Sequence, residues 1–219
     1  MNPHQVTRDF ERALCEYTGA PYAVAVNSCT MALLLAVAWH IQGPQRKPPP
    51  MSEPDGHDEY GDYRVHKIEI PKRTYVSVPM SIIHAGGRPV FREGEWVGLY
   101  QLRPLPVWDC ARWFSSQMYL NGNFMCLSFH ASKTLGVEQG GAILHDNPEA
   151  DAWLRRARFD GRTEGVAPKD DTFTQIGYHC YINPSTAAQG LLRLHSLPRH
   201  NEPLPNDDYP NLSTMEIFR

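Results

Sequence analysis

The stretch that decides the fold runs from Phe124 to Leu144 and reads FMCLSFHASKTLGVEQGGAIL. Two apolar runs within it, 124–127 and 142–144, have the length and composition of short buried strands. Between them stands one lysine, Lys133, among small and apolar residues. Burial lowers the pKa of a lysine amine and makes it nucleophilic enough to form a Schiff base with a carbonyl cofactor or substrate. The alternative is that Lys133 is an ordinary exposed lysine of a turn.

The composition narrows the class of protein. The chain has 219 residues, of which 42% are hydrophobic and 21% charged, and its formal net charge is −3. Such a chain can bury one sizeable core. Its charge balance favours neither nucleic acid nor an anionic membrane surface as a partner. The apolar run 31–41 is too short to cross a bilayer, and the polar start does not resemble a secretory signal, so a cytoplasmic protein is expected.

The five cysteines are odd in number, widely spaced and never in a Cys-x-x-Cys pair. This spacing favours neither a zinc site nor a disulfide framework. We therefore expect no metal site and interpret most of the cysteines as small buried hydrophobic residues of a reducing compartment.

The N-terminal third predicts a helix followed by a strand, a polar turn and a second helix. Apolar residues on one face predict an amphipathic helix over 6–17. A β-type run at 22–26 leads through the turn Asn-Ser-Cys-Thr into a strongly helical segment, 31–41. The amides and hydroxyls at such a helix start, together with the helix dipole, favour a bound phosphate. The alternative is that Asn27 or Ser28 only caps the helix.

Strands and helices continue to alternate along the chain. The patterns at 65–70, 74–85 and 89–91 predict a βαβ unit and hence a parallel sheet. A short strand at 105–108 then places Asp109 at its carboxyl end, where open α/β sheets bind their ligands.

Two stretches are poor in aliphatic residues and rich in proline. The first, 42–64, predicts a mobile surface loop inserted into a large domain that spans 1–197. The second, 198–219, predicts a polar tail.

Several motifs in this order along the chain resemble those of the DegT/DnrJ/EryC1/StrS family of pyridoxal-phosphate (PLP) enzymes, which are mostly nucleotide-sugar aminotransferases of fold type I. The similar segments read YTGA, VNSCTMAL, PKRTYVS, DCAR, SFHASKTLGVEQGGA and GYHCYIN. The resemblance implies an α/β three-layer sandwich with a mainly parallel sheet, the large domain of fold type I, with the C-terminal small domain largely absent. The stretch 92–106 is shorter than in the family, so the sheet is expected to lack at least one βα unit.

The resemblance also implies site residues. Lys133 would be the catalytic lysine that forms the Schiff base with PLP, and its presence where family dehydratases have histidine implies transamination. The cofactor-binding candidates match family positions around the phosphate and the pyridine ring: Ser28, Cys29, Thr30, Tyr75, Asp109, Arg112, Ser128 and His179.

Each of these candidates has a distinct role in the resemblance. The ring of Tyr75 would stack on the pyridine, unless this residue is a core aromatic, and Asp109 would pair with the protonated ring nitrogen. Arg112 stands where His or Gln is usual. His179 replaces an Asn that reaches the phosphate of the neighbouring subunit.

The function implied by the resemblance is transfer of an amino group from glutamate or glutamine to a keto-sugar nucleotide by a homodimer. Neither nucleic acid nor a membrane is expected as a partner. The alternative is a catalytically weakened, PLP-binding or non-catalytic relative that acts as a regulatory or partner subunit. The shortened chain and the departures at Arg112 and His179 motivate this second hypothesis.

Overall fold

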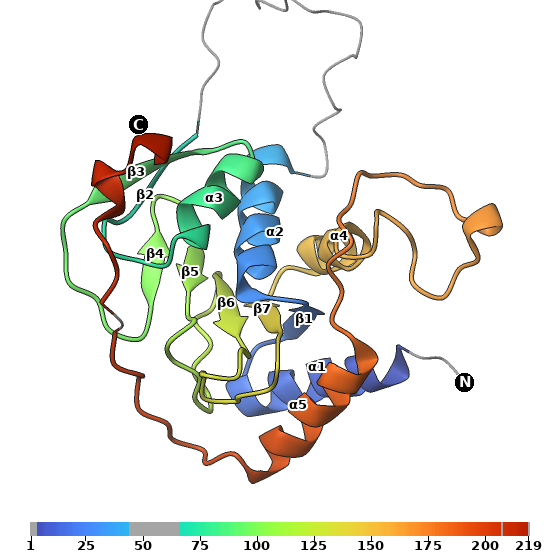
Figure 1. The fold of residues 1–219 in the computed structure, drawn as a ribbon. Coiled ribbons are helices and arrows are strands. Elements are labelled where there is room, and N and C mark those ends of the chain that lie inside the picture. Colours follow the sequence, from blue (N-terminus) through green and yellow to red (C-terminus); the bar gives the residue numbers. More distant parts are fainter. Residues whose placement is uncertain (1–3, 44–65, 207, 219) are drawn as a thin grey trace, which may run out of the picture.

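The structure, a computed structural model, describes residues 4–43, 66–206 and 208–218 (Figure 1). The expected mobile loop 42–64 lies outside the described residues except for its first two positions. The α-helices are α1 (Gln5–Thr18), α2 (Cys29–Gln42), α3 (Ser77–His84), α4 (Pro148–Ala157) and α5 (Pro184–Ser196). The strands are β1 (Tyr22–Val26), β2 (Lys67–Pro71), β3 (Arg88–Arg92), β4 (Tyr100–Leu102), β5 (Val107–Asp109), β6 (Phe124–Ser128) and β7 (Gly141–His145). Three short 3₁₀ helices are η1 (Pro168–Asp170), η2 (Leu212–Thr214) and η3 (Glu216–Phe218).

Five strands form one sheet in the order β1-β7-β6-β5-β4, and β2 pairs with β3 in a second, parallel pair. The expected βαβ unit is therefore present, with α3 connecting β2 to β3. The two sheets meet where Glu69 of β2 exchanges backbone hydrogen bonds with Arg103, which follows β4: the N–H of Glu69 donates over 2.7 Å and that of Arg103 over 3.1 Å.

The expectation of a mainly parallel sheet is wrong, because the five-stranded sheet is mixed. Only β5 and β6 run parallel in it, and its three other strand pairs are antiparallel. The connection 103–106 between β4 and β5 explains one of these pairs. Parallel neighbours need a crossover of a dozen or more residues, whereas four residues can only close a hairpin. The shortened stretch 92–106 thus contains a reversed strand and no helix.

Helices cover both faces of the sheet, which confirms the three-layer α/β organisation (Figure 1). Helices α2, α3 and α4 contribute to one buried cluster, and α1 and α5 contribute to the other. Strand β1 shows the division residue by residue, since Val24 and Val26 belong to the first cluster and Ala23 and Ala25 to the second. This alternation follows from the two-residue side-chain period of a strand.

The described residues of the tail, 198–206 and 208–218, pack against the body of the protein. Leu212 is fully buried, and its N–H donates a hydrogen bond of 2.8 Å to the carbonyl of Lys72. Three residues earlier in the tail, the ring of Tyr209 stacks on Trp96, with the ring centroids 6.1 Å apart. The described part of the tail is therefore part of the same folded unit.

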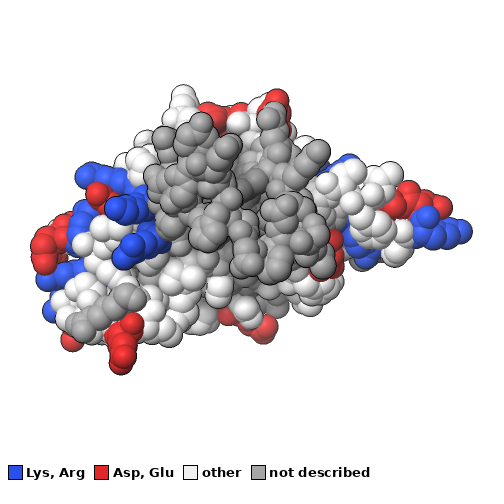
Figure 2. Space-filling model, turned by 90° about the horizontal axis from the view of Figure 1, so that it is seen from above, with Lys and Arg blue, Asp and Glu red and all other residues white. Residues whose placement is uncertain are grey.

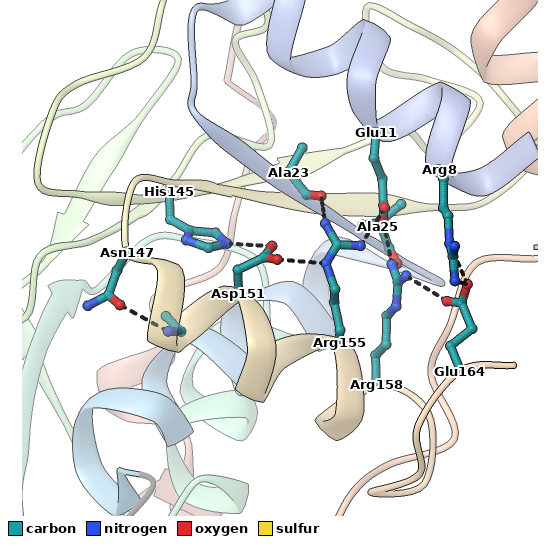
Figure 3. Close-up of polar contacts among 11 residues, drawn as sticks. Arg8, Glu11, Ala23, Ala25, His145, Asn147, Asp151, Arg155, Arg158 and Glu164 are labelled. Atoms are coloured by element: carbon teal, nitrogen blue, oxygen red, sulfur yellow. Dashed lines mark hydrogen bonds and ion pairs between the residues drawn. The ribbon is translucent and has the colours of Figure 1, made fainter. Parts of the chain in front are cut away.

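A buried ion network joins α1 to the end of α4 (Figure 3). The carboxylate of Glu11 accepts hydrogen bonds from the Arg155 guanidinium at 2.7 Å, from the Arg158 guanidinium, and from the N–H of Ala25 at 2.8 Å. Arg158 is only 1% exposed. Burial opposes ionisation of Glu11, but the charges of Arg158 and Arg155 and the Ala25 N–H outweigh it and lower its pKa. Glu11 is therefore a carboxylate that holds two helices together.

Candidate functional site

Three predicted features meet at one edge of the sheet. Asp109 and Ser128 are the last residues of the neighbouring parallel strands β5 and β6. Ser128 pairs with Gly141 at the start of β7, and Gly141 also pairs with Val26 at the end of β1. The chain then turns from β1 into α2 at Ser28, so the start of α2 lies beside the ends of these strands.

The start of α2 has the features of an anion site. Ser28 caps the helix, its Oγ accepting a hydrogen bond of 3.2 Å from the N–H of Met31. The first-turn amides of a helix lack partners inside it, and the helix dipole favours negative charge there. Gly141 lets β7 approach closely, because a Cβ at this position would lie 2.6 Å from the nitrogen of Cys29. Capping and anion binding are thus compatible roles for the same turn.

A hydroxyl pair brings the segment of Tyr75 to this helix start. The Oγ1 of Thr30 and the Oγ of Ser77, two residues after Tyr75, lie 2.8 Å apart. Tyr75 is 58% exposed. This exposure excludes the alternative that Tyr75 is a core aromatic and leaves its ring accessible to a ligand.

Asp109 is buried, with only 5% of its surface exposed. Its Oδ1 accepts a hydrogen bond of 2.9 Å from the N–H of Ala111, and its Oδ2 accepts one of 2.9 Å from the hydroxyl of Tyr100. Burial raises the pKa of Asp109, whereas the two donors and the charge of Lys133 act in the opposite direction. The site therefore contains a buried carboxyl group whose ionised form is favoured by the two hydrogen-bond donors.

Lys133 lies in the connection between β6 and β7, where its N–H donates a hydrogen bond of 2.8 Å to the carbonyl of His130. Its side chain is partly buried, so it is less exposed than the alternative of an ordinary exposed turn lysine implies. Its charge lowers the pKa of both Asp109 and Cys29, against the burial that raises them. The lysine thus lies in the segment that follows the end of β6, on the side of the sheet where Asp109 ends β5.

The remaining two candidates make other contacts. Arg112 is buried, and its guanidinium donates hydrogen bonds to the Pro205 carbonyl and, over 3.4 Å, to the Tyr209 hydroxyl, both in the tail. The exposed ring of His179 places its Nδ1 2.9 Å from Oδ2 of Asp160. Arg112 thus binds the tail, and the ring of His179 binds a neighbouring loop.

Sequence reasoning missed Tyr100, which contacts Asp109 directly. The signal available was an aromatic residue in the shortened stretch 92–106, but its role depends on the reversed strand β4. It also missed the buried pairing of Glu11, for which the signal was a glutamate between the apolar positions Phe10 and Leu14 of a helix.

A cavity of about 610 Å³ lies away from this site, over α1 and α4. Five arginines line it: Arg8, Arg12, Arg155, Arg156 and Arg162. Two of them pair with the carboxylates of Glu164 and Glu11, which also line the cavity (Figure 3). No predicted site residue belongs to its lining. The cavity thus lies beside the ion network and not at the ends of β5 and β6.

Charges of both signs are mixed on the described surface of one face (Figure 2). On the described atoms of the face in Figure 2, Lys and Arg stand beside Asp and Glu and form no extended field of one sign. Within residues 4–43, 66–206 and 208–218, no helix is long and apolar enough to cross a membrane. The same residues contain no group of three or more His, Cys, Asp or Glu placed to hold a metal ion. All five cysteines are free thiols.

The model of the DegT/DnrJ/EryC1/StrS aminotransferase family matches residues 3–47 and 112–203. The chain belongs to this family. The matched segments include Lys133, Ser128 and the turn at the start of α2. Tyr75 and Asp109 lie between the two matched segments, so their assignment rests on their own motifs and on the geometry above.

Individual relatives agree with this membership. The chain is 24% identical to the UDP-4-amino-4,6-dideoxy-N-acetyl-beta-L-altrosamine transaminase of Campylobacter jejuni subsp. jejuni serotype O:2, over 89% of this chain and 57% of that protein. Its fold resembles the sugar aminotransferase CalS13 from Micromonospora echinospora, with a TM-score of 0.70, 19% identity, and 88% and 61% of the two chains covered. It also resembles ntda from Bacillus subtilis with bound cofactor PMP, with a TM-score of 0.62, 17% identity, and 88% and 48% covered.

These likenesses show that the fold is that of the PLP-dependent sugar aminotransferases. The chain spans between about half and three fifths of the length of these three relatives.

Proposed function

We propose that this chain binds PLP and, with Lys133 as its catalytic lysine, transfers an amino group from glutamate or glutamine to a keto-sugar nucleotide. One observation carries the proposal: the helix start suited to an anion, the buried carboxyl of Asp109 and the connection that carries Lys133 lie at the same ends of neighbouring strands. Family membership and the sugar transaminase among the relatives support the choice of reaction.

The residues present fit the chemical groups of PLP. A phosphate fits the start of α2, where Ser28, Cys29 and Thr30 lie. A protonated pyridine nitrogen fits the carboxylate of Asp109. Ser128, at the neighbouring strand end, supplies a further hydroxyl on the same side of the sheet.

A planar ring has an accessible aromatic partner in the exposed side chain of Tyr75. The aldehyde of PLP requires an amine, which Lys133 supplies.

When bound, PLP supplies an electron sink for the carbon that loses or gains a proton during transamination. The chain contributes binding and proton transfer. The amine of Lys133 would hold the cofactor and, when free, would carry a proton to and from the reacting carbon. Asp109 holds a charge opposite to that of the ring nitrogen.

We further propose that the protein acts as a homodimer in the cytoplasm. Phe173 and Ile176, which are 54% and 73% exposed, lie just before His179, the residue assigned by resemblance to the neighbouring subunit's site. Exposed large apolar side chains on such a segment favour a protein partner. Five free thiols fit a reducing compartment.

A second candidate function is a PLP-binding partner subunit without turnover. The contacts of Arg112 favour it, because this residue replaces the usual His or Gln and donates hydrogen bonds to the tail.

The absorbance of the purified chain with PLP, before and after addition of glutamate or glutamine, separates the two functions. The aminotransferase is expected to give a band that requires Lys133 and that the amino donor converts to the pyridoxamine form. Lys133→Ala is the matched variant. A stable band that neither donor changes would favour the partner subunit, and no band at all would contradict PLP binding by this chain.

A further inference from the structure

Behind the candidate site lies a chain of buried hydrogen bonds that ends on Asp109. The hydroxyls of Thr74 and Tyr100 lie 2.6 Å apart, and the Tyr100 hydroxyl donates to Oδ2 of Asp109 over 2.9 Å. These three residues are 1%, 3% and 5% exposed, respectively. These hydrogen bonds are thus shielded from water. In such a low-dielectric interior each hydrogen bond is electrostatically stronger than it would be in water.

The donors and acceptors in this series of hydrogen bonds follow from the number of hydroxyl protons available. An ionised carboxylate only accepts, so the single hydroxyl proton of Tyr100 goes to Asp109. The Thr74 hydroxyl must then donate to the oxygen of Tyr100. A carboxylate has about four acceptor positions. Tyr100 and the N–H of Ala111 use one on each oxygen, which leaves capacity for a further donor.

The reversed strand explains why Tyr100 is at this position. In the β4–β5 hairpin, Tyr100 is the register partner of Asp109, directly across the two strands. Its ring packs edge-on against Trp96 with the centroids 4.7 Å apart, and Trp96 stacks on Tyr209 of the tail. Both the short connection 103–106 and the docked tail therefore hold Tyr100 against the carboxylate.

We propose that Tyr100 is a positioning residue: its hydroxyl, held by Thr74, keeps the Asp109 carboxylate ionised and in one orientation, so that it can pair with the protonated pyridine nitrogen of PLP. The cofactor half of this inference rests on the proposed function. The half that concerns Asp109 itself rests only on the residues described here.

The electrostatics around Asp109 agree with this role. Burial raises the pKa of Asp109, and the Tyr100 hydroxyl is one of the groups that lower it. Burial and then the charge of Asp109 raise the pKa of Tyr100 well above its ordinary value, so this hydroxyl stays a donor at neutral pH. Among the described residues, Lys133 also interacts with Asp109, as do three thiols of raised pKa, those of Cys29, Cys110 and Cys126.

The first experiment measures the ionisation of Asp109 without cofactor. The chain is labelled with ¹³C at its aspartate carboxyl carbons, the Asp109 signal is assigned with Asp109→Asn, and the signal is titrated with pH. Tyr100→Phe keeps the ring but removes the donor, so the pKa of Asp109 is expected to rise. Tyr119→Phe is the control, because that hydroxyl bonds the Asn123 carbonyl at 3.0 Å instead. An unchanged Asp109 titration in Tyr100→Phe would overturn the proposal.

The second experiment measures the dissociation constant of PLP. A hydrogen bond to a charged group supports an expected loss of affinity of about tenfold in Tyr100→Phe. In the Asp109→Asn background the same change is expected to have no further effect, since the charge on which it acts is gone. Thr74→Val, which removes the hydroxyl, should weaken PLP binding, whereas Thr74→Ser, which keeps it, should bind PLP as the unmodified chain does. Equal losses with and without Asp109 would show that Tyr100 acts only through packing and would overturn the positioning role.

The two experiments separate the possible failures. If the unmodified chain binds no PLP, the proposed function and the pairing with the pyridine nitrogen fail together. The titration of Asp109 then still decides whether Tyr100 controls this carboxyl group. If PLP binds but Tyr100→Phe changes neither the pKa of Asp109 nor the dissociation constant of PLP, the proposed function stands and the role of Tyr100 is refuted.

Discussion

Replacing Glu11 by glutamine tests the ion network that joins α1 to α4. The change keeps the size of the side chain and removes its charge. It leaves Arg158, which is 1% exposed, without the carboxylate that accepts from its Nη1. Arg155 is less affected, because Asp151 also accepts from it at 2.7 Å. The main cost is therefore that the buried guanidinium of Arg158 loses one of its two carboxylate partners and keeps Glu164 at 3.3 Å.

The magnitude follows from the number of contacts that change. Breaking a buried ion pair by removing one partner costs about 3–5 kcal/mol. The glutamine oxygen can still accept from the N–H of Ala25, and Glu164 remains 3.3 Å from Arg158. Both contacts reduce the loss of unfolding free energy, so we expect the Glu11→Gln variant to be destabilised by about 3 kcal/mol at neutral pH.

The destabilisation caused by Glu11→Gln should decrease as the pH falls. The pKa of Glu11 in the folded chain lies below its ordinary value of 4.5. Its contribution to stability is therefore fully present above that value and is lost as the pH falls toward the folded-state pKa. The difference in unfolding free energy between wild type and the Glu11→Gln variant should be largest near neutrality and shrink in acid.

Urea unfolding followed by circular dichroism, at pH 7 and at several acidic values, measures this difference. Glu16→Gln is the matched control, because Glu16 lies on the same helix and is exposed. The control should stay within about 0.5 kcal/mol of wild type. A loss below about 1 kcal/mol for Glu11→Gln at neutral pH, or a loss that grows in acid, would refute the reasoning.

Further predictions concern the cofactor cradle, the tail and the dimer. Gly141→Ala should lower both PLP affinity and thermal stability, because the new Cβ would lie 2.6 Å from backbone atoms at the start of α2; unchanged binding would contradict the close approach. Leu212→Ala should destabilise the chain by about 2–5 kcal/mol in urea unfolding, whereas Leu192→Ala, at a position 72% exposed, should cost little. Ile176→Asp should shift the mass measured by analytical ultracentrifugation from dimer to monomer, while Ile217→Asp, also exposed, should leave it unchanged.

Local patterns were enough to predict the elements that carry most of the site. The period of apolar residues predicted α1 and α2, and the polar turn before α2 predicted a cap at Asn27 or Ser28, of which the structure has Ser28. Short apolar runs predicted β6 and β7, and a strand end predicted the place of Asp109. These features depend on neighbouring residues, which a sequence displays directly.

Features that depend on distant residues were not predicted. The mainly parallel sheet implied by the resemblance was wrong, because which strands become neighbours, and so the antiparallel pairs of β1 and β6 with β7, depends on residues far apart in the chain. The docking of the tail rests on single residues such as Leu212, which a polar composition conceals. The two arginines that pair with Glu11 lie on α4 and directly after it, more than 130 residues away, so no local pattern reveals that this glutamate is buried.

The central claim is that Lys133 holds PLP at the end of this sheet. Incubation of the chain with PLP, reduction with borohydride and mass spectrometry of the digested protein test it most directly, because reduction fixes the cofactor to the amine that holds it. We predict that one peptide, the one containing Lys133, carries the reduced cofactor, and that Lys133→Ala leaves no such peptide. Label spread over several surface lysines, at the same level in the variant, would contradict the claim.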